Sequence, residues 1–212
     1  MRLPIAREGL LFVGPSLFLS LLCCFFHIYS LAIFFFLLFL FFLYFFRNPL
    51  RLHASGEDEL ISPADGKVMG VEEFFEDGFL REKIKRVSIF MSVCDVHVNR
   101  APCEGSVEKV KHVDGQFKLA FKKGIDDENE RNYIVIKHDN KRFLVVQIAG
   151  FLARRIICYV RESDKVKKGE SIGMIAFGSR VDVYMPAPYE PVVEPGQRVK
   201  SGLTVIARRV SG

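Results

Sequence analysis

The sequence predicts a mainly β fold, a compact sandwich or barrel, with an apolar helical membrane hairpin at the N-terminus. Three observations predict it. Residues 9–46 contain no Asp, Glu, Lys or Arg, which is enough chain for two short membrane helices. After residue 60 the chain consists of short β-branched runs separated by Gly and Pro. No window in this later part keeps the hydrophobic period of a helix, so few helices are expected there.

The apolar N-terminal stretch is too long for a cleaved signal peptide. Its 38 residues include twelve of the 21 phenylalanines. One bilayer-spanning helix needs about 20 apolar residues, and the apolar part of a signal peptide is only about 7–15 residues long. The polar cluster that begins at His27 predicts a turn between two helices, at roughly 10–26 and 28–46. A single long, tilted helix and a hairpin buried in a soluble protein are the alternatives.

Basic residues place the two ends of this segment. Arg2 and Arg7 precede it, and Arg47 and Arg51 follow it. The positive-inside rule puts such residues in the cytoplasm. We therefore expect residues 1–50 to anchor the chain in the cytoplasmic (inner) membrane, and residues 51–212 to form a β domain that faces the cytoplasm. The mild excess of basic over acidic residues after the apolar stretch suits contact with anionic lipid, and the lack of a long basic run argues against nucleic acid as a partner.

The cysteines of the predicted β domain indicate a reducing compartment. Cys94, Cys103 and Cys158 are an odd number of thiols without CxxC spacing. Such a pattern suits neither a zinc site nor a disulfide framework. No metal is therefore expected.

Several runs of the β domain have the length and composition of single strands. The sequence predicts strands at 87–91, 133–137, 143–147, 156–160, 172–177 and 181–185. The polar residues at 138–141 predict a hairpin turn. A valine, a turn glycine and a strand recur at 166–175 and 193–206, which predicts tight turns at Gly169 and Gly196. This repetition resembles the barrel-sandwich architecture of lipoyl-carrier domains, although no hairpin-tip lysine stands in a carrier context.

The pair Gly178–Ser179 lies between two of the predicted strands. A glycine before a serine in a tight turn has two explanations. It forms an ordinary hairpin, or it precedes a nucleophile and leaves room for attack because it has no Cβ. The dipeptide alone favours the ordinary turn, so the decision depends on the motifs around it.

Four motifs together resemble the phosphatidylserine decarboxylase family in its short, membrane-anchored prokaryotic form. They occur in the order and at the spacing of that family, and they span the chain from residue 60 onward. The apolar hairpin fits as well, because the substrate of the family is a membrane lipid. The matching segments are Ser-Pro-Ala-Asp-Gly at 62–66, Asp-Val-His-Val-Asn-Arg-Ala-Pro at 95–102, Glu-Asn-Glu-Arg-Asn at 128–132 and Phe-Gly-Ser-Arg-Val-Asp-Val-Tyr-Met-Pro at 177–186.

The resemblance implies an enzyme that makes its own cofactor. Ser179 would attack the carbonyl carbon of Gly178, the chain would break between them, and Ser179 would become a covalent pyruvoyl group. The chains 1–178 and 179–212 would remain together as a heterodimer. The amine of phosphatidylserine would then form a Schiff base with the pyruvoyl group and lose carbon dioxide, which leads to phosphatidylethanolamine.

The resemblance also implies catalytic roles for Asp65 and His97. Without it, Asp65 would be a turn-capping residue and His97 a structural histidine on a strand. With it, Asp65 is expected to activate Ser179, and His97, which titrates near neutrality, to supply a proton. Longer bacterial members have a second histidine where this chain has Arg100. Either His97 therefore serves both steps, or Asp65 acts on Ser179 without it.

Three arginines are candidate substrate-binding residues. Arg154 and Arg155 follow an apolar Phe-Leu pair and could hold a lipid phosphate. A solvated surface pair is the alternative for them. Arg180 stands where many family members have threonine, and it could approach the carboxylate or phosphate of the substrate.

Two other functions share these features. The same chemistry on archaetidylserine would use the same headgroup, and a membrane-tethered carrier or adaptor domain would have the same barrel without catalysis. The processing pair, with His97 and Asp65, argues against the carrier. The sequence leaves open the acyl-chain preference and whether copies of the chain associate.

Overall fold

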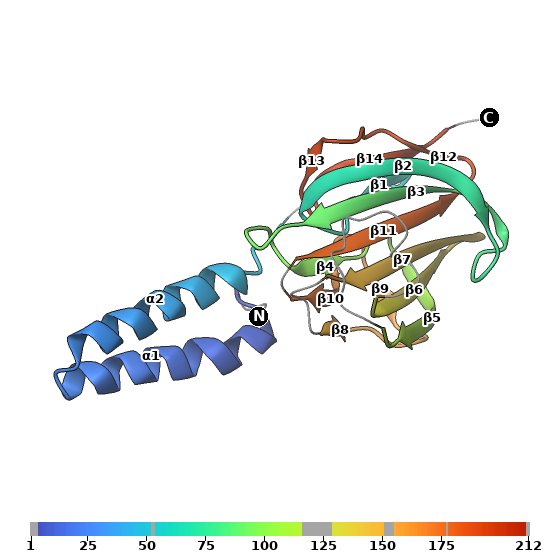
Figure 1. The fold of residues 1–212 in the computed structure, drawn as a ribbon. Helices are drawn as coiled ribbons and strands as arrows, with labels where there is room; N and C mark the ends of the chain where they lie inside the picture. Colours follow the sequence, from blue (N-terminus) through green and yellow to red (C-terminus); the bar gives the residue numbers. More distant parts are fainter. Residues whose placement is uncertain (1–3, 52–53, 116–128, 151–154, 177, 211–212) are drawn as a thin grey trace. The chain divides into compact units, whose positions relative to one another are not determined.

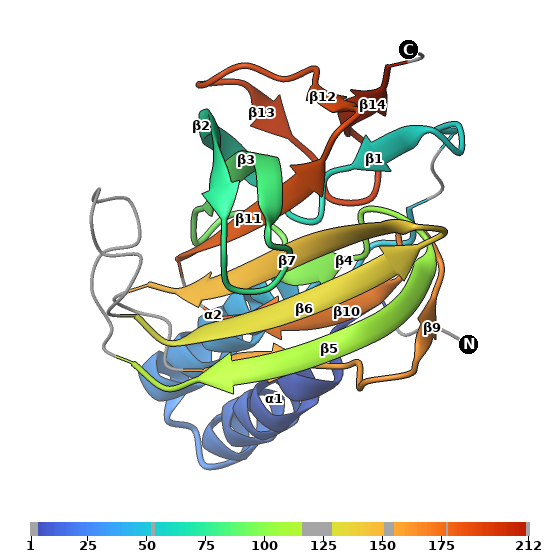
Figure 2. The same cartoon turned by 90° about the vertical axis from the view of Figure 1, so that its right-hand side faces the viewer.

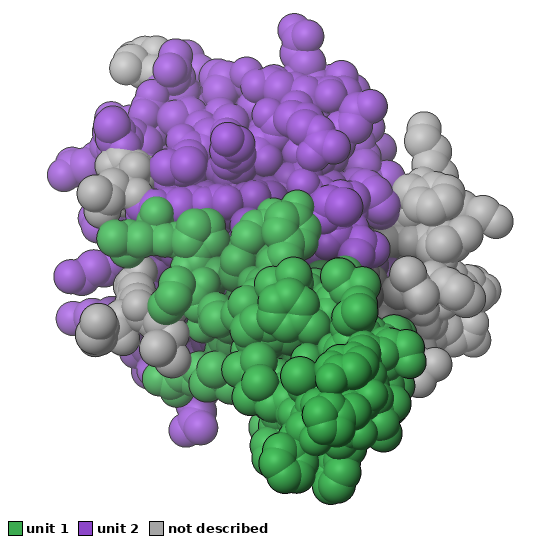
Figure 3. All heavy atoms as spheres, turned by 90° about the vertical axis from the view of Figure 1, so that its left-hand side faces the viewer, with its two compact units in different colours: residues 1–50 green, residues 51–212 purple. Residues whose placement is uncertain are grey.

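The structure is a computed structural model that describes residues 4–51, 54–115, 129–150, 155–176 and 178–210 (Figure 1). Contacts divide the chain into two compact units, residues 1–50 and residues 51–212 (Figure 3). The described part of the first unit is helical, and the regular elements of the second are strands. The division therefore coincides with a change in secondary structure.

Two apolar helices and a short 3-10 turn form the first unit. The turn η1 covers Arg7–Gly9, helix α1 covers Leu10–Phe25, and helix α2 covers Tyr29–Phe45. The chain reverses at His27, whose φ of 59° lies in the left-handed region. Its ring Nδ1 lies 2.8 Å from the Tyr29 hydroxyl oxygen. The break that the polar cluster predicts is therefore present.

The two helices pack against each other through aromatic rings and one polar contact. The Phe12 and Phe42 ring centroids are 5.2 Å apart, and the Ser20 hydroxyl donates a 2.9 Å hydrogen bond to the Ala32 carbonyl. Many Leu and Phe side chains of both helices are exposed. The segment Arg7–Phe25 is long and apolar enough to cross a bilayer, and α2 is a shorter apolar helix. An exposed apolar surface of this kind indicates membrane association.

The second unit confirms the predicted mainly β class. Each run that the sequence predicts as a strand overlaps a strand of the structure. The strands are β1 (Glu59–Ile61), β2 (Gly66–Glu76), β3 (Glu82–Met91), β4 (Val98–Arg100), β5 (Gly105–Val113), β6 (Arg131–His138), β7 (Lys141–Ala149), β8 (Ile156–Cys158), β9 (Lys165–Val166), β10 (Ser171–Ile175), β11 (Ser179–Pro186), β12 (Tyr189–Pro191), β13 (Arg198–Val199) and β14 (Val205–Arg209).

These strands form one large antiparallel sheet and two small ones. The large sheet has the order β13-β2-β3-β11-β7-β6-β5-β9, and the small sheets have the orders β1-β14-β12 and β4-β10-β8. The large sheet is strongly curved (Figure 2). Buried apolar side chains from all three sheets form a common core, among them Leu60, Ile134, Ile172, Val181 and Ile206. Strand β11 lies between β3 and β7, so neighbours pair with it on both sides.

The turns occur where the sequence predicts them. Strands β6 and β7 are joined by Asp139 and Asn140, and Asp139 has a φ of 50°. Such a two-residue loop needs positive φ, which Asp and Asn tolerate. Gly169 and Gly196 have φ values of 77° and 94°, a conformation that favours glycine. Small sheets around a curved large one are compatible with the comparison to carrier domains.

Candidate active site

The Gly178–Ser179 pair opens strand β11. Gly178 has a φ of 62°, in the left-handed region that favours glycine. Apart from its chain neighbours, no described atom lies within 4 Å of the position that a Cβ would take. Ser179 is completely buried and pairs with Met91 of β3 and Ala149 of β7. Among the described residues, the pair thus joins a peptide with open space beside it to a serine fixed inside the sheet.

A line of buried polar side chains ends at Ser179. The Asn132 amide nitrogen donates to Gln147 Oε1 over 2.9 Å, and Gln147 Nε2 donates to Asn99 Oδ1 over 2.8 Å. Asn99 Nδ2 then contacts Met91 Sδ at 3.5 Å, the same sulfur that the Ser179 hydroxyl contacts at 3.5 Å. We call Asn132, Gln147 and Asn99 the amide relay. All three amides are at most 1% exposed.

Sequence reasoning missed the amide relay, although signals for it were present. Asn99 and Asn132 lie inside two of the four family motifs, and Gln147 ends an otherwise apolar run at 143–147. A neutral amide on a buried strand needs a partner, because burying it without hydrogen bonds costs free energy. The pattern therefore predicts that such residues find one another, but not which ones do.

The Glu-Asn-Glu-Arg-Asn motif at 128–132 acquires a physical role beside Ser179. The side chain of Asn129 donates a 2.8 Å hydrogen bond to the carbonyl of Ala149, which is the strand partner of Ser179. The backbone nitrogen of Ala149 in turn donates to the Glu130 carbonyl over 3.0 Å. The motif therefore fixes the end of β7 next to the serine. Glu128 itself lies outside the described residues.

His97 lies in the same chain segment as Asn99 of the amide relay. It is completely buried and directly precedes strand β4, two residues before Asn99. Its carbonyl oxygen accepts a hydrogen bond of 3.3 Å from the backbone nitrogen of Ile175. Strand β10 thereby holds the His97 segment in place.

Asp65 is held by partners that are distant in sequence. Its carboxylate accepts hydrogen bonds from both terminal nitrogens of Arg51, at 2.8 Å for the Nη2–Oδ2 pair, and it forms an ion pair with that guanidinium. The backbone nitrogen of Ser201 donates to Asp65 Oδ1 over 2.8 Å. Among the described residues, the hydrogen-bond partners of this carboxylate are thus Arg51 and Ser201, and Ser179 is not one of them.

Arg100, which replaces the second histidine of longer family members, lies in the region of Asp65. It is buried, and its Nη1 donates to the Gly169 carbonyl over 3.0 Å. A Cβ on Gly202, the neighbour of Ser201, would lie 2.9 Å from Arg100 Cδ. The arginine therefore packs against the loop whose backbone binds the Asp65 carboxylate.

Arg180 is oriented away from Ser179. Alternate residues of a strand face opposite sides of the sheet, and Val181 and Val183 share the core side with Ser179. On the other side, Arg180 Nε and Nη2 contact the two carboxylate oxygens of Asp182 at 2.7 and 2.5 Å. The expected contact of Arg180 with substrate therefore has no support from its position.

The other two arginine candidates are Arg154 and Arg155. Arg155 is exposed, as a residue that meets a lipid headgroup could be, and an exposed position equally fits a solvated surface residue. Arg154 lies outside the described residues.

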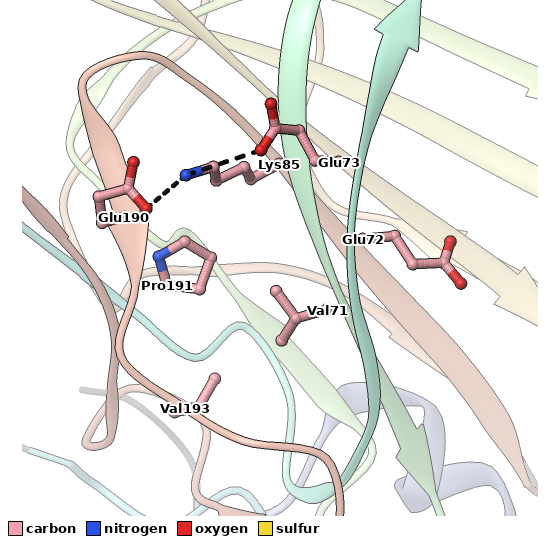
Figure 4. A pocket seen from close by; sticks show the side chains of 7 residues that line it. All are labelled: Val71, Glu72, Glu73, Lys85, Glu190, Pro191 and Val193. Carbon is pink, nitrogen blue, oxygen red and sulfur yellow. Dashed lines mark hydrogen bonds and ion pairs between the residues drawn. The ribbon is translucent and has the colours of Figure 1, made fainter.

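A surface pocket of about 330 Å³ lies elsewhere, beside β2, β3 and β12 (Figure 4). Lys85 Nζ is bound by Glu190 and lies 3.9 Å from a carboxylate oxygen of Glu73. None of the candidate residues that the structure describes is among its lining. The lining consists of Val71, Glu72, Glu73, Lys85, Glu190, Pro191 and Val193.

Comparison with known proteins relates the chain to one family. A family model described as phosphatidylserine decarboxylase matches residues 38–207. The chain is 49% identical over 174 residues to a phosphatidylserine decarboxylase proenzyme of Carboxydothermus hydrogenoformans, which covers 82% of each protein. It is 44% identical over 200 residues to the protein of that name from Syntrophus aciditrophicus, 93% of this chain and 94% of the relative. A putative archaetidylserine decarboxylase proenzyme of Methanothermobacter thermautotrophicus is 44% identical over 192 residues, 85% and 86% of the two chains.

Proposed function

We propose, because the chain belongs to the phosphatidylserine decarboxylase family, that it converts phosphatidylserine to phosphatidylethanolamine after cleaving itself between Gly178 and Ser179. The observation that carries the proposal is the geometry of this pair. A glycine with positive φ, and with open space beside it among the described residues, precedes a completely buried serine at the start of a central strand. The word proenzyme in the names of the relatives supports a processing step.

The proposed cleavage uses the atoms of the pair itself. Ser179 Oγ attacks the carbonyl carbon of Gly178, the C–N bond breaks, and an ester replaces the peptide. β-Elimination then breaks the ester C–O bond, which leaves a carboxylate on Gly178 and a dehydroalanine at residue 179. Water adds and ammonia leaves, so the new chain begins with a pyruvoyl group. A serine needs a base and a polarised carbonyl for such an attack.

The two products would stay together through the sheets. Residues 179–212 contribute β11, β12, β13 and β14. Strand β11 pairs with β3 and β7, β13 pairs with β2, and β14 pairs with β1. Each of those partners belongs to residues 1–178. A heterodimer of the two chains would therefore keep the core intact after one peptide bond is lost.

The surroundings of Ser179 fit a small neutral carbonyl group in its place. The side chains of its strand partners, Met91 and Ala149, carry no charge, and the Asn99 amide that contacts Met91 is neutral as well. The pyruvoyl group supplies a ketone that holds the electron pair left when carbon dioxide departs. The chain must provide a proton donor for the reacting carbon and residues that bind the headgroup of the substrate.

We assign these roles to the residues that the family resemblance indicates. His97 is the proton donor, since an imidazole can exchange a proton near neutral pH. Asp65 activates Ser179, and its carboxylate is oriented by Arg51 and by the Ser201 amide. Arg155, with Arg154, is the proposed phosphate contact, because guanidinium groups bind phosphate with paired hydrogen bonds.

The proposed location is the cytoplasmic membrane, with the β unit on the cytoplasmic side. The exposed apolar surface of α1 and α2 supports insertion, and arginines before and after the apolar stretch support a hairpin with both ends inside. In right-side-out vesicles, tags at residues 1 and 212 should then be equally protected from protease. Opposite accessibility of the two tags would mean a single span.

Archaetidylserine is the second candidate substrate, and the archaeal relative with that name favours it. Both lipids carry a serine headgroup on a phosphate, so the proposed catalytic groups would act on either. Vesicles with equal amounts of the two lipids distinguish them, because the one consumed faster has the larger kcat/KM.

The central experiment follows the mass of the purified chain. The wild type should consist of residues 1–178 and 179–212, with the second chain blocked to Edman degradation, and should release carbon dioxide from phosphatidylserine vesicles. Ser179→Ala should run as an intact chain of 24.2 kDa without activity. Ser88→Ala removes another buried serine of the same large sheet and should cleave normally. A wild type that stays intact, with a free serine at 179, would exclude the decarboxylase and favour a carrier or adaptor.

A further inference from the structure

The amide relay has a fixed direction. An amide side chain donates from its nitrogen and accepts on its oxygen. Gln147 Nε2 occupies the oxygen of Asn99, so the nitrogen of Asn99 faces Met91 and, through it, Ser179. Asn132 fixes Gln147 in the same way from the other end. The line therefore determines which end of Asn99 is presented toward the reactive serine.

Gly173 leaves room for this arrangement because it has no Cβ. A Cβ on Gly173 of β10 would lie 2.7 Å from Gln147 Nε2 and 2.6 Å from the Ile157 carbonyl oxygen. Real Cβ atoms do not approach other atoms so closely, so a side chain here would displace the Gln147 amide. The small sheet β4-β10-β8 thus supplies both the space for Gln147 and, on β4, the residue Asn99.

The relay ends on an unusual acceptor. The Met91 thioether receives both the Asn99 amide and the Ser179 hydroxyl, each at 3.5 Å, and a thioether sulfur is a weak acceptor. Methionine has a flexible side chain, so its sulfur takes a defined position only where neighbours fix it. The Asn99 contact can fix it. The hydroxyl of Ser179 is then held in one rotamer by a bond that is easily exchanged.

We propose that Asn132, Gln147 and Asn99 are positioning residues for the self-cleavage, and that they act through Met91. They place Ser179 Oγ for attack on the Gly178 carbonyl carbon. In that step the Oγ–C bond forms, the C–N bond breaks, and the hydroxyl proton passes to the departing nitrogen. The inference rests on the proposed function. Because the hydroxyl no longer exists once Ser179 is converted, the relay controls maturation more than turnover.

The test measures how fast residues 179–212 appear after cell-free synthesis in the presence of vesicles. Asn99→Leu and Met91→Leu should each slow cleavage about tenfold, which corresponds to about 1.4 kcal/mol of activation free energy. The double variant should be no slower than the slower single variant, because both substitutions remove one contact. In chains that have matured, carbon dioxide release per pyruvoyl group should fall by a smaller factor than the cleavage rate.

Two further variants separate positioning from folding. Asn99→Asp keeps the shape of the side chain and an acceptor for Gln147 but presents no donor to Met91, so it should slow cleavage as Asn99→Leu does. Ile134→Ala shortens a core residue of β6 on the same side as Asn132; it should lower the thermal midpoint without slowing cleavage.

Several results would overturn the inference while the proposed function stands. If folded Asn99 variants cleave as fast as the wild type, the relay has no role in the cleavage. The same conclusion follows if the slowing factors of Asn99→Leu and Met91→Leu multiply in the double variant. Equal slowing by Ile134→Ala would mean that stability alone sets the rate. A wild type that never cleaves would instead overturn the proposed function, and the relay with it.

Discussion

The two faces of strand β11 hold their polar groups in opposite ways. On the core face, the Ser179 hydroxyl and the Asn99 amide meet at a thioether sulfur, through weak bonds between neutral groups. On the other face, Arg180 grips Asp182 with two charge-assisted bonds, which are shorter and stronger than neutral ones. Neighbouring residues of one strand therefore lie in very different surroundings.

The difference has a chemical reason. The Ser179 hydroxyl must exchange its hydrogen-bond partner during the reaction, and a weak bond to a neutral sulfur is easily exchanged. The same strand must also stay in place when the peptide bond before it breaks. Charges locked on the opposite face can secure it without contacting the serine. We infer that the core face of β11, which carries Ser179, serves the reaction. The opposite face, which carries Arg180 and Asp182 and which we call the charged face, serves stability.

The largest expected effect concerns His97, the proposed proton donor. His97→Ala should lower turnover by about 10²–10⁴-fold, the usual contribution of a positioned general acid, even in molecules that carry the pyruvoyl group. Mass spectrometry gives the fraction processed, and turnover is then expressed per pyruvoyl group formed. His138→Ala, which removes a partly buried histidine at the end of β6, should leave turnover unchanged. Near-normal turnover of processed His97→Ala protein would assign the proton to water or another residue.

The second-largest expected effect is on the free energy of unfolding, and it concerns the Arg180–Asp182 ion pair of the charged face. Asp182 is completely buried, and Arg86 Nη1 also lies 3.8 Å from its carboxylate. Removing one partner of a buried ion pair costs about 3–5 kcal/mol, so Asp182→Ala should lower the free energy of unfolding by that amount in denaturant titrations. The fraction that remains folded should still cleave.

A matched double variant controls for the charge. Arg180→Met combined with Asp182→Leu replaces the ion pair by apolar side chains, and such replacements are often nearly neutral. This variant should be far more stable than Asp182→Ala. It also tests the expectation that Arg180 binds substrate. A rise in KM for phosphatidylserine in the double variant would restore that role and would contradict the division between the two faces.

Much of this fold could be predicted from the sequence because its signals are local. The charge-free stretch and the polar cluster at His27 locate the helices, and β-branched runs with turn glycines locate the strands. The strand order could not be predicted, because β11 pairs with β3 and β7 from distant parts of the chain. Pairing of that kind depends on packing across the core rather than on local propensity.

The site was only partly predictable for the same reason. The motifs indicate Gly178–Ser179 and His97 as candidates, and their roles stay predictions. The partners of Asp65 are Arg51 and the Ser201 backbone amide, which no spacing rule indicates. The strand begins at Ser179 in the structure, so alternation along β11 places Arg180 opposite Ser179, which the motif did not indicate. Motif resemblance names residue types, whereas the direction of each side chain follows from strand register.

The smallest expected effect sharpens the comparison by pH. Tyr184 also lies on the charged face, where burial, and then the Asp182 charge, raise the pKa of its phenol. A raised pKa in the folded state contributes stability that is complete below the unfolded value of about 10 and is lost as the pH rises above it. At pH 8, Tyr184→Phe should lower the free energy of unfolding by about 1 kcal/mol, because the variant lacks the hydrogen bond with Arg86. Above pH 10 the wild type should lose up to about 1.4 kcal/mol per pH unit more than the variant.

Unfolding titrations at pH 8 and about pH 11 measure both effects, with exposed Tyr159→Phe as the control. Parallel pH profiles for the wild type and Tyr184→Phe would show that the phenol ionises freely in the folded chain. The charged face would then be more open to water than the Arg180–Asp182 ion pair indicates.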